Sequence, residues 1–203
     1  MIYLDDNGVT VIADRKAKIG EYYSLGDKQY IVVDNSTLWD MVNNGDDVSN
    51  VVTTRVTNMA QLFNPNYHFD LENLNPNIKS WDVSRVKTMN GMFEDNEEFN
   101  QDISNWKVSK VKNMSYMFCG AISFNQAIGM WDVSSVTHMK GMFCGASNFN
   151  QNLSNWNVEK VESMSEMFMD AESFDSPINS WNMQWVFSMK SMFANANSFN
   201  QDI

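Results

Sequence analysis

The sequence has few cysteines, no long apolar run and no excess of positive charge, and each shortage excludes a class of protein. Two cysteines, Cys119 and Cys144, among 203 residues are too few for a disulfide-rich secreted scaffold. No apolar stretch approaches the roughly 18 residues of a spanning helix, so no insertion into a membrane is predicted. The formal net charge of −11 disfavours binding to the phosphates of nucleic acids.

The N-terminal residues lack the features of an export signal. The chain begins Met1-Ile-Tyr-Leu-Asp-Asp, without a basic segment followed by an apolar one. We therefore expect a virion-associated or cytoplasmic location. A cell-surface location would need a leader that this sequence lacks, or an export route that uses none.

Residue patterns typical of catalysis are missing as well. The two histidines, His68 and His138, belong to no readable Ser–His–Asp or Cys–His arrangement, and no Gly-rich phosphate loop occurs. No Cys or His spacing suits a metal site, and the acidic run at residues 94–98 lacks the spacing of a calcium loop. We expect no enzyme, no metal and no cofactor.

What the sequence does contain is a repeat with a period of 25 residues, in which most units open with tryptophan. These tryptophans are Trp81, Trp106, Trp131, Trp156 and Trp181. Six units are predicted, at residues 51–80, 81–105, 106–130, 131–155, 156–180 and 181–203. The first has Val51 in place of tryptophan, and it carries an Asn/Pro-rich loop at residues 64–69 and 75–77.

Each unit is predicted to form a short strand, a helix of about two to three turns and a polar turn. In the third unit, Trp106 and Val108 share one face of an extended segment, and Ser109 is a candidate N-cap. Apolar residues then follow at helical spacing, at Val111, Met114, Met117, Phe118 and Ala121. The predicted fold class is an α/β solenoid, a leucine-rich-repeat-like stack of six strand–helix units.

A parallel β-helix without helices is the alternative fold, and the cysteines distinguish the two. Units stacked through helices would lie about 8–10 Å apart. That separation is too large for a disulfide between Cys119 and Cys144, which occupy the same place in adjacent units. Coils of a β-helix would stack at about 4.8 Å and bring the two cysteines close together.

Stacking places equivalent residues in rows. The predicted rows are the five tryptophans, then Phe93, Phe118, Phe143, Phe168 and Phe193, then Phe99, Phe124, Phe149, Phe174 and Phe199. Most of the methionines recur at two further positions and are interpreted as core. A ladder of turn asparagines is expected at Asn100, Asn125, Asn150 and Asn200. Asp175 should loosen this ladder, because a carboxylate cannot donate.

Residues 1–50 do not match the repeat and are predicted to form a small α+β cap over the solenoid of residues 51–203. The segment Val9–Ala13 alternates like a strand, and Leu25-Gly26-Asp27 suits a hairpin turn. A helix should begin after Asp34-Asn35-Ser36 and end at Gly45.

The functional prediction rests on residues that the repeat leaves variable. The polar strand face opposite the core contributes Asn105, Lys107, Asp132, Asn157 and Asn182. In the last unit, Trp185 and Phe187 should point outward, as residues at contact surfaces often do. These residues are the predicted site for a protein or glycan ligand. The last apolar edge, near Ile203, must be covered by a second copy, by a continuation of the chain or by nothing, and we expect concentration-dependent self-association through it.

The repeat also resembles a known family. The run Phe-Asn-Gln-x-Ile-Ser-x-Trp-x-Val-Ser-x-Val-x-x-Met-x-x-Met-Phe, near-literal at Phe99–Trp106, is similar to BspA-type leucine-rich repeat surface proteins, above all the branch abundant in mycoplasmas. The resemblance covers residues 51–203. It implies a curved solenoid used in adhesion or recognition, without catalytic residues. The expected function is a non-enzymatic recognition module, with a virion component or self-assembling module as the alternative.

Overall fold

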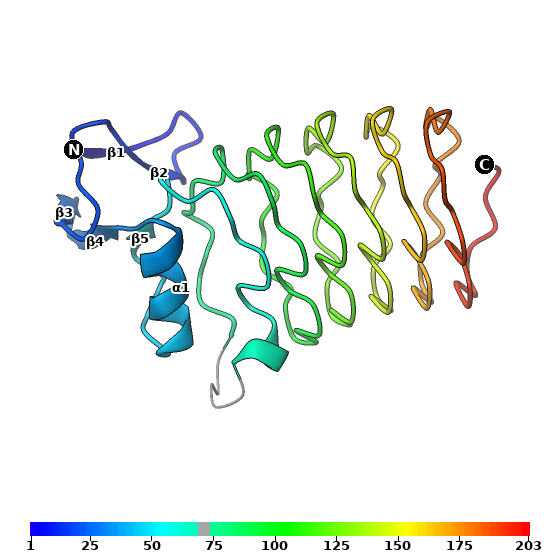
Figure 1. The fold of residues 1–203 in the computed structure, drawn as a ribbon, viewed down its shortest axis with the longest axis horizontal. Helices are drawn as coiled ribbons and strands as arrows, with labels where there is room; N and C mark the ends of the chain where they lie inside the picture. Colours follow the sequence, from blue (N-terminus) through cyan, green and yellow to red (C-terminus); the bar gives the residue numbers. More distant parts are fainter. Residues whose placement is uncertain (69–73) are drawn as a thin grey trace.

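The N-terminal part of the chain holds most of the regular secondary structure. The computed structural model describes residues 1–68 and 74–203. Its elements are β1 (Ile2–Leu4), β2 (Val11–Ala13), β3 (Tyr22–Leu25), β4 (Lys28–Val32), α1 (Asn35–Asn43), β5 (Val51–Val52) and a 3-10 helix, η1 (Pro65–Tyr67). Strands β1 and β2 pair antiparallel, as do β3 and β4, and β5 joins β4 in parallel (Figure 1). Phe69, at the end of the predicted loop, lies outside the described residues.

The predicted hairpin and helix in this part are confirmed. The turn at Gly26 and Asp27 joins β3 to β4. The side chain of Asp34 caps α1 by accepting the N–H of Thr37 at 2.9 Å, and Gly45 follows the helix with a left-handed φ of 74°. Leu38 and Val42 of α1 are buried in the same apolar cluster as the first repeat unit. The helix therefore covers one end of the core.

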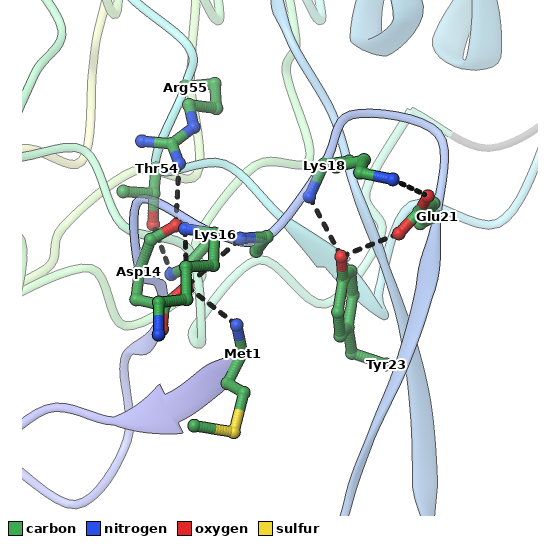
Figure 2. A network of polar contacts seen from close by, with 10 residues as sticks. Met1, Asp14, Lys16, Lys18, Glu21, Tyr23, Thr54 and Arg55 are labelled. Atoms are coloured by element: carbon green, nitrogen blue, oxygen red, sulfur yellow. Dashed lines mark hydrogen bonds and ion pairs between the residues drawn. The ribbon is translucent and has the colours of Figure 1, made fainter.

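Asp14 fixes the start of the chain to the first repeat unit. Its carboxylate accepts from the N-terminal amine at 2.7 Å and its carbonyl accepts from Arg55 Nη2 at 2.6 Å (Figure 2). The adjacent Ala13 N–H donates to Thr54 Oγ1 at 3.0 Å. The contacts with Thr54 and Arg55 join residues 41 positions apart in the sequence, so β2 is held against the repeats.

The predicted α/β solenoid of strand–helix units is wrong. Within the described residues α1 is the one α-helix, and after β5 the β-pairing between units is limited to isolated parallel bridges such as Asn113 with His138. Each unit is a coil of successive turns, and the coils lie side by side along the molecule (Figure 1). A leucine-rich repeat does not describe this fold. The structure is closer to the alternative fold, a parallel β-helix without α-helices, but its coils consist of turns where a β-helix has strands.

Two left-handed residues in each of the last five units explain why no helix forms there. In the third unit Tyr116 has a φ of 57° and Gly120 a φ of 70°, which a right-handed helix excludes. Alternate N–H groups in this stretch close short turns within the coil. The others reach the next coil, as Phe118 N–H does to the carbonyl of Met142 at 2.9 Å. The backbone therefore satisfies its hydrogen bonds without helical pairing.

The predicted rows of aromatic residues are confirmed. Phe93, Phe118 and Phe143 stack with ring centroids 5.6 and 5.7 Å apart and planes within 7° of parallel. The second phenylalanine row stacks at 5.8 to 6.1 Å, and Trp106 lies 6.4 Å from Trp131. Neighbouring coils are thus in direct contact, and their side chains form one continuous core.

The asparagine ladder is present, but the prediction that Asp175 loosens it is wrong. Asn125 Oδ1 accepts from Asn150 N–H at 3.0 Å and from Gln151 Nε2 at 2.8 Å. Asp175 Oδ1 accepts in the same way from Asn200 N–H at 2.8 Å and from Gln201 Nε2 at 2.9 Å. The ladder uses this position as an acceptor, which a carboxylate also is. These bonds lower the pKa of Asp175, the largest effect coming from Gln201.

Candidate functional site

Two of the predicted site residues are already occupied by the N-terminal segment. Lys107 Nζ forms an ion pair with Asp5 Oδ2 at 2.5 Å, and Asn105 Nδ2 donates to Thr10 Oγ1 at 3.3 Å. The hydrogen bond between Lys107 and Asp5 lowers the pKa of the Asp5 carboxyl and raises the pKa of the Lys107 amine. This part of the polar face therefore contacts the protein's own chain.

Three further predicted residues, Asp132, Asn157 and Asn182, are exposed but hold turns together. Each side-chain oxygen accepts the N–H of the residue two positions later, at 3.1, 3.1 and 3.3 Å respectively. Such Asx turns are a structural role that the residue type alone explains. In Asp132, hydrogen bonding by Ser134 also lowers the pKa.

Trp185 and Phe187 point outward, as predicted. Their side chains are 57% and 80% exposed, while Val186 between them packs against the core. They line a hollow of about 520 Å³, which we call the aromatic hollow. Its other walls are Thr137, Glu159, Lys160 and Glu162. The predicted site thus divides into an occupied region at Asn105 and Lys107 and an open one here.

A row of basic side chains leads to the aromatic hollow. Each unit has a valine at the position equivalent to Val186. The residues just before and just after this valine line up across the coils in two columns, which contain Trp185 and Phe187. Their exposed cationic members, which we call the basic stripe, are Arg85, Lys87, Lys110, Lys112 and Lys160. Arg55 of the first unit is half-buried and donates to the carbonyl of Asp14, so it is not part of the stripe. They flank buried Val86, Val111 and Val161.

Backbone hydrogen bonds hold the stripe in register. Lys112 N–H donates to the carbonyl of Lys87 at 2.8 Å, and Thr137 N–H donates to that of Lys112 at 2.9 Å. The series continues through Glu162 to Phe187 at 2.9 and 2.8 Å. The side chains of one column therefore follow each other once per coil, on a backbone that is already ordered before any ligand binds.

The basic stripe is unusual in an acidic protein. Within residues 1–68 and 74–203, none of its five cations forms an ion pair within 4.0 Å, although acidic residues outnumber basic ones by 25 to 14. Unpaired cations in fixed positions are a ready site for an anion.

The sequence contained a signal for the stripe that our prediction missed. Lys or Arg stands beside the second valine of the repeat at Val86, Val111 and Val161, although not at Val136. The net charge of the whole chain concealed this local concentration of positive charge.

Comparison with protein families identifies what the repeat belongs to. The model of the family described as "Mycoplasma protein of unknown function, DUF285" matches residues 33–137 and 123–203. The chain belongs to this family. The stripe and the aromatic hollow lie entirely within the residues that the family model matches. Comparison with curated proteins and with solved structures found no significant match.

Membership in DUF285 confirms the mycoplasma-type resemblance at the level of the family. The leucine-rich-repeat part of that resemblance has no support in the fold. In the described part of the chain, no helix is long and apolar enough to cross a membrane. No group of three or more His, Cys, Asp or Glu side chains is placed there to hold a metal ion.

Proposed function

We propose that this protein is a non-enzymatic recognition module that binds an acidic glycan along the basic stripe and in the aromatic hollow. The observation that supports it is a set of five exposed cations that form no ion pair with any described residue, in register with two exposed aromatic rings at their end. The sequence predicted a protein or glycan ligand, and this proposal specifies a sugar polymer. It also places the ligand on the basic stripe and the aromatic hollow, not on the polar strand face.

The composition of the hollow favours a sugar ring. The indole of Trp185 offers an apolar surface on which the C–H face of a sugar can stack. Around it, Glu159 and Glu162 can accept hydrogen bonds from sugar hydroxyls, and Lys160 and Thr137 can donate them. A volume of about 520 Å³ is within the range of small-ligand sites.

The stripe favours acid groups on the same polymer. Arg85, Lys87, Lys110 and Lys112 lie on successive coils beyond the hollow, so a ligand anchored at Trp185 and extended along the stack meets each pair in turn. Carboxylate and sulfate groups pair with such cations through charge-assisted hydrogen bonds. Because the backbone is preorganised, the ordering cost on binding is small.

A nucleic acid fits this surface less well. The carboxylates of Glu159 and Glu162 would face phosphates, which cannot donate hydrogen bonds to them. A glycan can instead place its hydroxyl groups against these carboxylates, because hydroxyls donate hydrogen bonds.

The test compares four ligands by titration calorimetry at low and moderate salt: a sulfated glycan, a carboxylated glycan, a neutral glucan and single-stranded DNA. Binding of at least one acidic glycan, weakened by salt, is expected. Neutralising Lys110 and Lys112 together, each to Gln, should raise Kd about tenfold, and Trp185→Ala should do the same.

The matched control replaces two exposed lysines outside the stripe, Lys16 and Lys28, with Gln. It removes the same charge and should leave Kd within about twofold. Equal losses in control and stripe variants, tighter binding of DNA, or no acidic glycan bound at low salt would each contradict the proposal.

A second candidate is self-association through the C-terminal end of the stack. There the core is open: Met189 is 49% exposed and lines a hollow of about 190 Å³ with Met183, Met192 and Phe193. In the fifth unit, Met164 and Glu166 donate their N–H groups to the last coil at 2.9 Å. The equivalent N–H groups of the last coil donate to nothing within the described residues.

The opposite end of a second copy can supply acceptors to this row of donors. The carbonyls of Asn58 and Ala60 at that end accept no hydrogen bond within the described residues, and both residues line a shallow surface hollow beside α1. We therefore propose a head-to-tail contact, which does not close and can grow. No observation favours the virion alternative.

Sedimentation over a range of concentrations tests this second candidate. The weight-average mass should rise with concentration, and Met189→Asp should abolish the rise by placing a charge in the apolar contact. The control Met130→Asp alters a methionine that is 82% exposed in another unit, and should still associate. A constant monomer mass at high concentration would refute self-association.

A further inference from the structure

The two cysteines lie next to each other in adjacent coils. The column that contains them reads Glu94, Cys119, Cys144, Met169 and Ala194, one residue per coil. Its register is set by the residue that follows each member, since Gly120 N–H donates to the carbonyl of Cys144 at 2.7 Å. The separation of about 8–10 Å expected for helix-mediated stacking does not apply.

Neighbouring residues in this region are in van der Waals contact. A Cβ added to Gly145 would lie 3.6 Å from Gly120 Cα, and the rings of Phe118 and Phe143 are 5.7 Å apart and nearly parallel. Residues paired across coils this close have Cα atoms about 5 Å apart. A disulfide needs a Cα separation of about 4.4–6.8 Å.

The two thiols are accessible and not equivalent. Both side chains are partly exposed and reduced. Hydrogen bonding between the thiols raises the pKa of Cys119 and lowers that of Cys144, while burial and nearby carboxylates oppose ionisation of both. Cys144 is thus the better nucleophile of the pair.

We propose that Cys119 and Cys144 form a redox-active dithiol that closes to an intramolecular disulfide between adjacent coils. The oxidant is a small disulfide such as oxidised glutathione. The Cys144 thiolate attacks one of its sulfurs, forms a mixed disulfide and releases one glutathione thiolate. The deprotonated Cys119 thiol then attacks the Cys144 sulfur and releases the second glutathione. Two cysteine thiols lose two electrons and two protons, and one glutathione disulfide becomes two thiols.

The experiment treats the protein with oxidised glutathione and follows free thiols and intact mass. The wild type should lose both thiols, gain no glutathione, stay monomeric by denaturing electrophoresis and melt at least about 5 °C higher. Cys119→Ser should accumulate one glutathione on Cys144, because nothing can displace it. Cys144→Ser should likewise keep one glutathione on Cys119, because no second thiol is left to displace it.

A matched pair of variants tests whether adjacency is the cause. Cys119→Ser with Met169→Cys places thiols in neighbouring coils at positions 144 and 169, and should form the bridge. Cys144→Ser with Met169→Cys places them two coils apart, at positions 119 and 169, and should instead carry two glutathiones. Persistence of both wild-type thiols, stable double glutathionylation, or a bridge between chains would overturn the proposal.

Discussion

Replacing Phe118 with alanine is expected to lower the free energy of unfolding by about 3–5 kcal/mol. The ring is completely buried. It lies 3.8 Å from Phe124 in its own coil, and 5.6 and 5.7 Å from Phe93 and Phe143 in the coils on either side, measured between centroids. Alanine would leave a cavity that two rigidly stacked neighbours cannot fill by moving.

Urea titration followed by tryptophan fluorescence and circular dichroism measures this change, and the two transitions should coincide if the stack unfolds as one unit. Phe187→Ala is the control, since that ring is 80% exposed and its loss should change stability by no more than about 0.5 kcal/mol. A loss below about 1 kcal/mol for Phe118→Ala would mean that the aromatic row is not the core.

Replacing Gly141 with alanine should cost about 2–4 kcal/mol, from two causes. Gly141 has a φ of 58°, which alanine tolerates poorly. An added Cβ would also lie 2.6 Å from the ring of Tyr116 in the preceding coil. Lys140 lies over that ring at 5.4 Å from its centroid, which limits the movement of the tyrosine.

A double-mutant cycle with Tyr116→Ala separates these causes. With the ring removed, Gly141→Ala should cost only the conformational part, about 1–2 kcal/mol, so the coupling energy should be about 1–2 kcal/mol in favour of the double variant. Additive losses would show that Tyr116 does not constrain this position. Thermal or urea unfolding of the four proteins provides the values.

Much of the core could be predicted because it depends on spacing alone. A period of 25 residues places the tryptophans and phenylalanines in rows whatever the path of the chain inside a unit, and the rows are present. The helix α1 was also predictable, since Asp34 and Gly45 are local signals that act on their own neighbours.

The helix within each unit was predicted wrongly because two structures share its signal. Apolar residues at intervals of three occur on a helix face, and they also occur where successive short turns point their side chains inward. The left-handed positions that decide between them carry Tyr116, Gly141 and Glu166 in successive coils, so no common residue type marks them. Hydrogen bonds to the adjacent coils stabilise that conformation.

By itself, the sequence determined the repeat, its register and the inward or outward side of most residues, including Trp185 and Phe187, because these follow from periodicity. Which outward residues are free depends on tertiary contacts. Lys107 and Asn105 form polar contacts with a segment about 100 positions earlier, whereas Lys110 and Lys112 form no ion pair within the described residues. The tertiary structure also places Cys119 next to Cys144. Both outcomes depend on contacts between distant parts of the chain, which local patterns do not encode.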